Sequence, residues 1–376
     1  MFRDATPEKT IAFVRYSVAL TYCWPLPSTA TKSRVFRFKI LRFLVLLNAF
    51  MLLGPLLYAM HVHRDDPGKV SKAALLSLAI MQVLVQTSFC AVHYNRFQRL
   101  IEEMELCCEN ATSCERLVFQ RYIGQYSVFY GMSAIWFYVT ATIVVLGTIL
   151  VPGPLTTNPE YPFPVDFEPL RSFLYVHQGL VGLQCSAHAC VNAFCALLLL
   201  FAAARYENLM TELRAVTDAA SLIKCIEKYY IVKRYARDAV HAVRFIALIT
   251  VTLCGIAVVF SGISFVGRQP FNVKIQSFSL AATGLLEVFM CALPADHLMD
   301  MSETVMQKAY ESEWYEQRLK IQKCILFTLV PQPPVVLSIK CIIPALSLRY
   351  YCSFISNVFS LFTALRIVMV KDEDDN

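Results

Sequence analysis

The sequence predicts an all-α membrane protein with seven transmembrane helices, a cytoplasmic N-terminus and an extracellular C-terminus. Three observations support this prediction. First, 57% of the 376 residues are hydrophobic and 16% are charged, whereas ordinary globular chains are charged at about a quarter of their positions. Second, seven apolar runs are long enough to cross a bilayer core of about 30 Å. Third, Lys and Arg are distributed unevenly between the connecting loops, which sets the orientation.

The apolar runs place the predicted spans in order along the chain. Most of them meet or exceed the roughly 20 residues that a spanning helix needs. The sixth run contains Glu287, and an ionisable side chain at membrane depth is rare unless it faces a cavity, water or a partner. Both a structural and a functional role for Glu287 therefore stay open. The approximate spans are 40–62, 72–94, 122–151, 172–204, 240–267, 273–296 and 345–370.

Basic residues orient these spans. Many Lys and Arg residues precede the first span, and many lie between the fourth and fifth, so both segments are predicted to be cytoplasmic. The segment 151–170 contains no Lys or Arg and is rich in proline, so it is predicted to lie outside. The N-terminal segment has charged residues where a signal peptide needs an apolar core, so no cleavable signal is expected. The glycosylation sequence Asn110-Ala111-Thr112 falls on the cytoplasmic side and is predicted to stay unmodified.

Three charged segments next to the spans have acids and bases mixed at helical spacing. They cover residues 96–121, 205–238 and 297–335, and the last ends at Pro331, Pro333 and Pro334. We expect helices that extend into the cytoplasm and pack together there as an anchor. No tandem repeat or separate soluble domain is evident, so residues 1–376 form a single unit.

Several function classes are excluded by the residues. The net charge of +6 comes mainly from loop residues that set membrane orientation, so no nucleic-acid partner is expected. No catalytic motif is present, and the chain is not predicted to be an enzyme. Cys185, His188, Cys190 and Cys195 lie within one span without the close pairs of structural zinc sites, so no metal and no cofactor are expected.

Aromatic and polar residues at middle or outer membrane depth predict a ligand cavity. An apolar, aromatic cavity with a few polar groups suits a small organic molecule, and aromatic walls favour an aromatic one. For each single residue, plain helix packing is the alternative interpretation. The candidate ligand-binding residues are Met81, Gln82, Gln86, Trp136, Phe137, Thr140, Tyr175, His177, Gln178, Phe278, Ser279 and Thr283.

The last span has small polar residues along one helical face. Ser353, Ser356, Asn357, Ser360 and Thr363 recur at steps that gather them on that face, while the phenylalanines fall largely elsewhere. Small hydroxyl residues let helices approach and bond across an interface. The other interpretation is a pore-lining helix.

Three features of the chain resemble the insect odorant receptor family. They are the run Ala309-Tyr310-Glu311-Ser312-Glu313-Trp314-Tyr315, the last span with Ser347-Leu348 at its start and Phe362-Thr363-Ala364-Leu365 near its end, and the inverted seven-span layout. The C-terminus lacks the TYxxxxxQF-like ending of gustatory receptors. The second inner loop is shorter than that of the shared co-receptor, Orco, which indicates an odorant-tuning subunit.

The resemblance implies an odorant-gated, non-selective cation channel in the plasma membrane of a sensory neuron dendrite, in which this subunit joins Orco in a heterotetramer. It implies that the last span lines the pore, with Ser356, Asn357 and Ser360 along the conduction path. The hydrophobic gate then falls near Ala364, Ile367 and Val368, and the odorant pocket lies among the second to sixth spans. The alternatives are a metabotropic seven-transmembrane chemoreceptor and a gustatory receptor channel.

Overall fold

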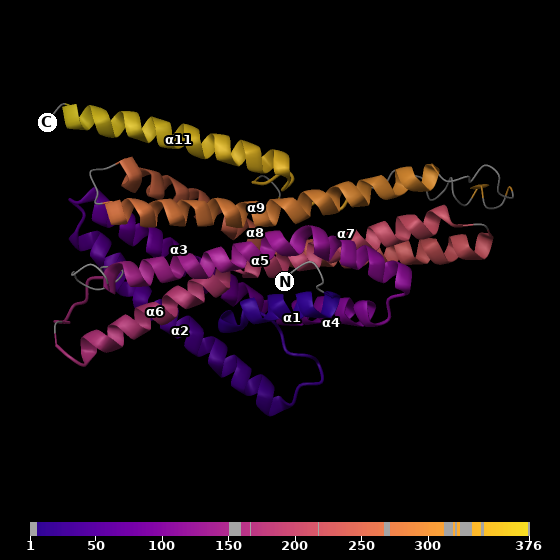
Figure 1. The fold of residues 1–376 in the computed structure, drawn as a ribbon, viewed down its shortest axis with the longest axis horizontal. Coiled ribbons are helices and arrows are strands. Elements are labelled where there is room, and N and C mark those ends of the chain that lie inside the picture. The colour runs from indigo at the N-terminus through magenta and orange to yellow at the C-terminus, as the bar shows by residue number, and fades with distance from the viewer. Residues whose placement is uncertain are drawn as a thin grey trace.

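The computed structural model describes residues 6–149, 159–165, 167–216, 218–266, 271–311, 319, 322–323, 333–339 and 342–374. Within these ranges helices dominate, and the single β-bridge joins Ile339 and Ile343. The helices are α1 (Pro7–Ser17), η1 (Ala19–Thr21), α2 (Lys32–Val62), α3 (Pro67–Val92), α4 (Tyr94–Glu109), α5 (Ser113–Ile149), α6 (Leu170–Ala189), α7 (Val191–Arg214), α8 (Ala219–Val266), α9 (Phe271–Tyr310) and α11 (Leu348–Asp374) (Figure 1).

Polar residues determine where several helices begin. The Asp66 carboxylate accepts hydrogen bonds from the backbone N–H groups of Gly68 and Lys69, at 3.1 and 3.2 Å, at the start of α3. At the start of α5, Glu115 Oε2 accepts from the backbone N–H of Thr112 at 2.8 Å, and Thr112 Oγ1 accepts from that of Glu115 at 3.4 Å. These caps satisfy N–H groups that have no partner inside the helix. Thr112 therefore acts as a helix cap within the glycosylation sequence.

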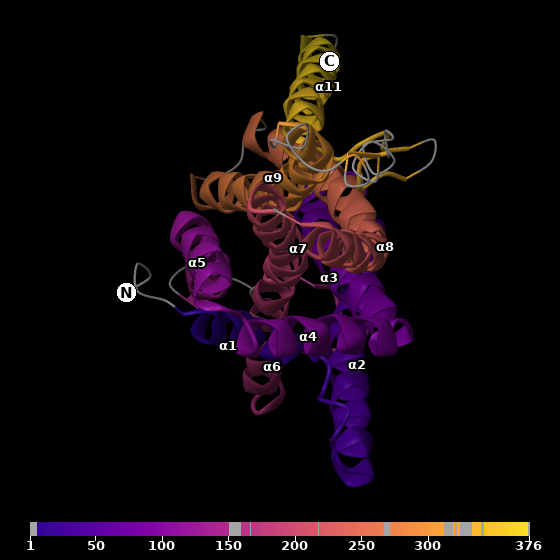
Figure 2. The same ribbon diagram turned by 90° about the vertical axis from the view of Figure 1, so that its right-hand side faces the viewer.

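Helix α7 forms the centre of the bundle (Figure 2). Its sequence is apolar on every side through Val191–Ala204, and a helix of that composition is stable when other elements surround it. Phe194, Leu198 and Leu199 are fully buried. Helix α7 packs against α8 and α9, which complete the core.

The predicted span 172–204 is divided between two helices, α6 and α7. They separate at Cys190, whose backbone angles are φ −68° and ψ −11°. A similar junction at His93 separates α3 from α4. Neither junction contains Gly or Pro, the residues that mark helix breaks in a sequence, and the break at Cys190 inside the predicted span was therefore not expected.

Five helical segments among the described residues are long and apolar enough to cross a membrane. They are Lys32–Val62, Gly68–Val92, Leu170–Arg214, Ala220–Phe265 and Lys274–Val305. The two other predicted spans, 122–151 and 345–370, fall in α5 and α11, which are not among these five segments.

The charged helix ends that were predicted to form the anchor lie beside one another. Arg205 of α7 contacts Glu103 of α4 at 2.7 Å, and Lys228 of α8 contacts Glu212 of α7 at 2.6 Å. Figure 1 shows the junction of α7 and α8 at one end of the molecule and the C-terminus at the other. Helix α9 continues to Tyr310, while residues 312–315 of the sequence run used for the family resemblance lie outside the described residues.

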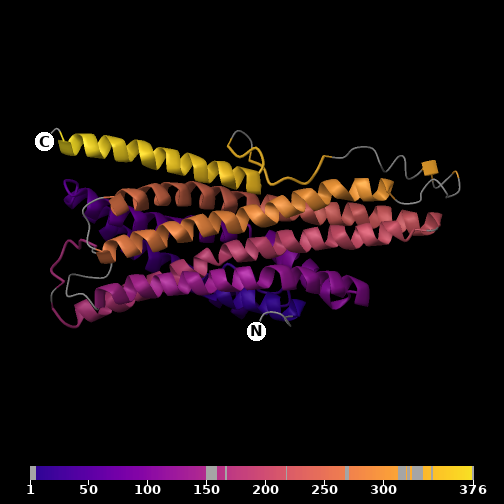
Figure 3. The ribbon, with the colours of Figure 1, turned by 45° about the horizontal axis from the view of Figure 1, so that its top comes forward.

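Helix α11 packs against the rest of the bundle along one face (Figure 3). The rings of Phe354 and Phe362 lie over Gly255 and Gly262 of α8. A β-carbon at Gly255 would be 3.2 Å from Phe354 Cε2, and one at Gly262 would be 2.5 Å from Phe362 Cδ2. Two glycines one heptad apart on α8 therefore provide the space that these two rings occupy.

Candidate functional site

A cavity of about 120 Å³ lies between α2, α3, α5, α6 and α9. An engineered apolar cavity of about 150 Å³ binds benzene, so a cavity of this size is on the scale of a small organic molecule. Most of its wall is apolar, and polar side chains converge on it from four helices. The polar lining residues are Gln82, Thr140, Gln178, Ser186, His188, Thr283 and Glu287.

Part of the predicted ligand-binding set lines this cavity. These residues come from the second, third, fourth and sixth predicted spans, and their side chains meet although the chain positions are far apart. They are Gln82, Phe137, Thr140, Gln178 and Thr283. The Thr140 hydroxyl is buried and has no hydrogen-bond partner among the described residues.

Three more predicted residues lie just behind the lining. Trp136 Nε1 donates a hydrogen bond to Thr283 Oγ1 at 3.1 Å. Thr283 Oγ1 in turn donates to the backbone carbonyl of Ser279 at 2.8 Å. Gln86 Oε1 lies 2.8 Å from Nε2 of His188, a lining residue. Trp136, Ser279 and Gln86 thus position lining side chains without being part of the wall.

Four predicted residues lie elsewhere. Met81 and Phe278 are on the helix surface, with 39% and 62% of their areas exposed. The Tyr175 ring lies 5.8 Å from the guanidinium carbon of Arg171. His177 lines a separate cavity of about 620 Å³ near the start of α6, where its Nε2 lies 3.0 Å from the carbonyl of Asn48.

Sequence reasoning left several lining residues out of the candidate set. Leu52 of α2 contributes to the wall, although no residue of the first span was a candidate. His188 was considered only as part of a metal motif, and no group of three or more metal-binding side chains occurs among the described residues. Glu287 was recognised as unusual, and its place in the cavity wall gives a reason for an ionisable residue there.

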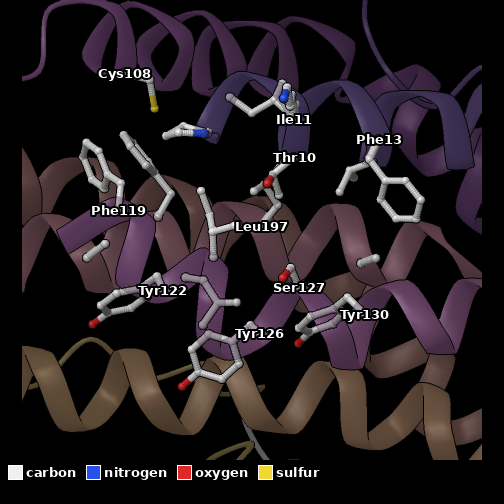
Figure 4. Close-up of a pocket in the computed structure, with 18 of the residues that line it drawn as sticks. Thr10, Ile11, Phe13, Cys108, Phe119, Tyr122, Tyr126, Ser127, Tyr130 and Leu197 are labelled. Carbon is white, nitrogen blue, oxygen red and sulfur yellow. The ribbon is translucent and has the colours of Figure 1, made fainter. Parts of the chain in front are cut away.

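A second, larger cavity of about 380 Å³ lies under α1. Figure 4 shows Thr10, Ile11 and Phe13 of α1 across this cavity from three tyrosines of α5. Two of the tyrosine hydroxyls bind α9: Tyr122 lies 2.9 Å from His297 Nε2, and Tyr130 donates to the carbonyl of Met290 at 3.1 Å. This cavity also has polar side chains in its wall, but it contains none of the predicted ligand-binding residues.

Ser356 and Ser360 of the polar stripe of α11 face away from the helix surface that packs on α8, whereas Ser353 and Asn357 line a cavity of about 320 Å³ between the two helices. Ser356, Asn357, Ser360 and Ala364 are exposed, and so is Ile367, with 63% of its area accessible. Ser360 Oγ donates to the carbonyl of Ser356 at 2.9 Å, so this hydroxyl is satisfied within its own helix. The side chain of Val368 lies outside the described part of the structure.

Long apolar helices around a small internal cavity define the class of protein: an all-helical membrane protein with space for a small molecule. A family model described as 7tm Odorant receptor matches residues 66–366. The chain belongs to this odorant receptor family.

Two solved structures share the fold. The insect olfactory receptor OR5 from Machilis hrabei superposes with a TM-score of 0.78 at 14% identity, covering 95% of this chain and 97% of that one. The structure of OR5 in complex with eugenol gives 0.79 at 13% identity, covering 96% and 98%. A search of curated proteins found no match.

Proposed function

We propose that this protein is an odorant-tuning subunit of an odorant-gated, non-selective cation channel and that it works with the Orco co-receptor. The observation that best supports this proposal is the cavity between α2, α3, α5, α6 and α9, in a chain that belongs to the odorant receptor family. The plasma membrane of olfactory sensory neurons is the location expected for such a subunit.

The proposed ligand is a small aromatic odorant held in this cavity. Phe137 and apolar side chains supply contact area, while Thr140, Gln178 and Thr283 supply polar contacts. OR5 of Machilis hrabei, which shares the fold, has been solved in complex with eugenol, a small aromatic molecule. Trp136, hydrogen-bonded to Thr283, holds one of these polar groups in place.

The proposed pore is lined by α11 from each of four subunits. Ser356 and Ser360 are exposed and lie opposite the face that packs on α8, which suits a surface turned toward a channel axis, and the exposed Asn357 lies at the edge of the packed face. Ala364, Ile367 and Val368 are the proposed gate. An odorant that binds the open conformation more tightly than the closed one shifts the population toward open channels.

The proposed topology has the seven predicted spans, a cytoplasmic N-terminus and an extracellular C-terminus. A tag placed after Asn376 is therefore expected to bind antibody on intact cells. A metabotropic receptor with a cytoplasmic C-terminus would show the tag only after the membrane is permeabilised. That result would contradict the proposed orientation.

The direct test is electrical. Cells that express this chain together with Orco are exposed to a panel of volatiles while the current is recorded. We expect at least one volatile to open a cation current that persists when G-protein signalling is blocked with GDPβS. Cells expressing Orco alone are the control. Silence to the whole panel at normal surface level, or a current that GDPβS removes, would count against a channel subunit.

A further inference from the structure

The carboxyl group of Glu287 lies on the wall of the small cavity, at the middle of α9. Glu287 is 6% exposed, and none of the ion pairs among the described residues includes it. Gln82 Nε2 and Asn192 Nδ2 donate hydrogen bonds to it, at 2.6 and 3.0 Å. Both bonds end on the same oxygen, Oε2. Since a carboxylate has about four acceptor positions, these two donors leave acceptor capacity.

The surrounding network determines which way the Asn192 amide points. Gln86 Nε2 donates to the carbonyl of Ile246 at 3.2 Å and to Thr250 Oγ1 at 2.9 Å. The Thr250 hydroxyl then donates to Asn192 Oδ1 at 3.1 Å. This bond leaves Asn192 Nδ2 to face Glu287. The donor and acceptor roles are consistent along this series of hydrogen bonds, so Glu287 is the acceptor at the end of the network.

A second polar group on the cavity wall has no protein partner. Thr140 is 5% exposed, lines the cavity, and its Oγ1 makes no hydrogen bond to any described residue. A buried hydroxyl without a partner is unfavourable, so such a group points to a ligand or water that completes it. The cavity therefore contains a buried carboxyl and an unsatisfied hydroxyl in an otherwise mostly apolar wall.

From this arrangement we infer that the cavity selects small apolar molecules that carry a hydrogen-bond donor, the donor binding the carboxyl of Glu287. Alcohols, phenols and primary amines share this chemistry. Ethers and hydrocarbons of the same shape lack the donor and leave the remaining acceptor capacity of Glu287 unused. The inference rests on the proposed function, because it takes this cavity as the odorant site. It adds the ligand class that the fold alone does not specify.

Matched ligand pairs test the inference. The probes are eugenol and its O-methyl ether, 2-phenylethanol and its methyl ether, and 2-phenylethylamine, applied to cells that express this chain with Orco. An ordinary hydrogen bond contributes about two-fold to ten-fold in affinity. We therefore expect each donor ligand to be several-fold more potent than its ether. The amine and the alcohol compared directly show whether charge adds to the preference.

Glu287→Gln replaces an acceptor oxygen of the side chain with a donor group and keeps the size of the side chain. The amide oxygen still accepts from Gln82 and Asn192, and the amide nitrogen replaces an acceptor with a donor. The preference for alcohol over ether is expected to disappear or invert. Simple loss of a structural contact would instead shift both members of a pair by the same factor. Surface biotinylation measures how much of the variant reaches the membrane.

Thr140→Val is the second variant, because it removes a hydroxyl that makes no internal hydrogen bond. We expect normal surface level and a several-fold loss of potency for alcohols and ethers alike, because the Thr140 hydroxyl can donate to the oxygen of either ligand. Ser77→Ala is the matched control: its hydroxyl is also buried without a described partner, but Ser77 does not line the cavity. Its potencies are expected to equal those of the wild type.

The outcomes separate this inference from the proposed function. Equal potency within each pair, or a donor preference unchanged in Glu287→Gln, overturns the inference. So does silence to all five probes while other volatiles open the channel. Silence to every volatile tested would instead count against the proposed channel function itself.

Discussion

Replacing Gly262 with alanine tests how α11 is held against α8. The added β-carbon would lie 2.5 Å from Cδ2 and 2.9 Å from Cε2 of the Phe362 ring. Carbon atoms in contact are ordinarily about 3.5–4.0 Å apart, so the ring or the helix must move by about 1 Å. The stripe of Ser356 and Ser360 is on the opposite side of α11. Moving α11 away from α8 therefore pushes the stripe toward the proposed channel axis.

The size of the effect follows from the cost of overpacking. Inserting a methyl group into a well-packed contact typically costs about 1–3 kcal/mol. Since about 1.4 kcal/mol is a factor of ten, the balance between closed and open states can shift by about five-fold to more than a hundred-fold. If opening needs α11 to move back toward α8, Gly262→Ala opposes opening. We expect a smaller odorant current at unchanged surface level.

Two other glycines make the experiment a graded series. At Gly255 the β-carbon would be 3.2 Å from Phe354 Cε2, which a shift of a few tenths of an ångström relieves. At Gly124 of α5 the added carbon meets nothing within 4 Å. Gly124→Ala therefore measures the effect of helix propensity alone, about 1 kcal/mol in favour of alanine. The expected order of current loss is Gly262, then Gly255, then Gly124.

The assay is the odorant current divided by the surface level from biotinylation. Phe362→Leu removes the ring that causes the clash, so the double variant with Gly262→Ala is expected to recover part of the current. A coupling energy from this cycle shows that the two positions act through one contact. If Gly262→Ala matches Gly124→Ala in normalised current, the contact between α8 and α11 has no role in gating.

Three further predictions concern the ligand cavity, the pore and the orientation. Trp136→Ala removes a large ring and its hydrogen bond to Thr283, so the set of activating odorants should change at normal surface level, which dose-response curves measure. Ser360→Asp should alter the relative permeability to calcium and sodium, which reversal potentials measure, whereas Phe359→Asp should only lower expression. Wild-type reversal potentials for Ser360→Asp would contradict a pore-lining stripe. The wild-type chain should show no mobility shift on endoglycosidase treatment, because Asn110 is predicted to be cytoplasmic and unmodified. A shift that disappears in Asn110→Gln would contradict the proposed orientation.

Helix positions were largely predictable from the sequence, because long apolar runs mark the segments that are stable as helices in an apolar environment. The predicted range 40–62 lies within α2, and 240–267 overlaps α8. Helical extensions beyond the spans were predictable from charged segments of helical spacing, and most of α4 and the start of α8 lie in these segments. The break at Cys190 was not predictable, since no Gly or Pro lies at the junction and no side chain caps α7 there.

The cavity was only partly predictable, because sequence position gives the depth of a residue in the membrane but not the direction in which it points. Neighbours on a helix differ by about 100° in direction. Gln82 lines the cavity while Met81 is 39% exposed, and Ser279 is buried while Phe278 is 62% exposed. Each pair has nearly the same depth, and both members were candidates.

The direction of a helical residue depends on how neighbouring helices are rotated, and this rotation is set by contacts distant in sequence. A buried polar residue is informative here, because its hydrogen-bond partners must come from other helices. Glu287 required donors, and they come from Gln82 of α3 and Asn192 of α7. Had Glu287 been used as the reference point, Gln82 would have been preferred over Met81 from the sequence alone. Ionisable residues within apolar runs are therefore the most useful starting points for locating the site in this chain.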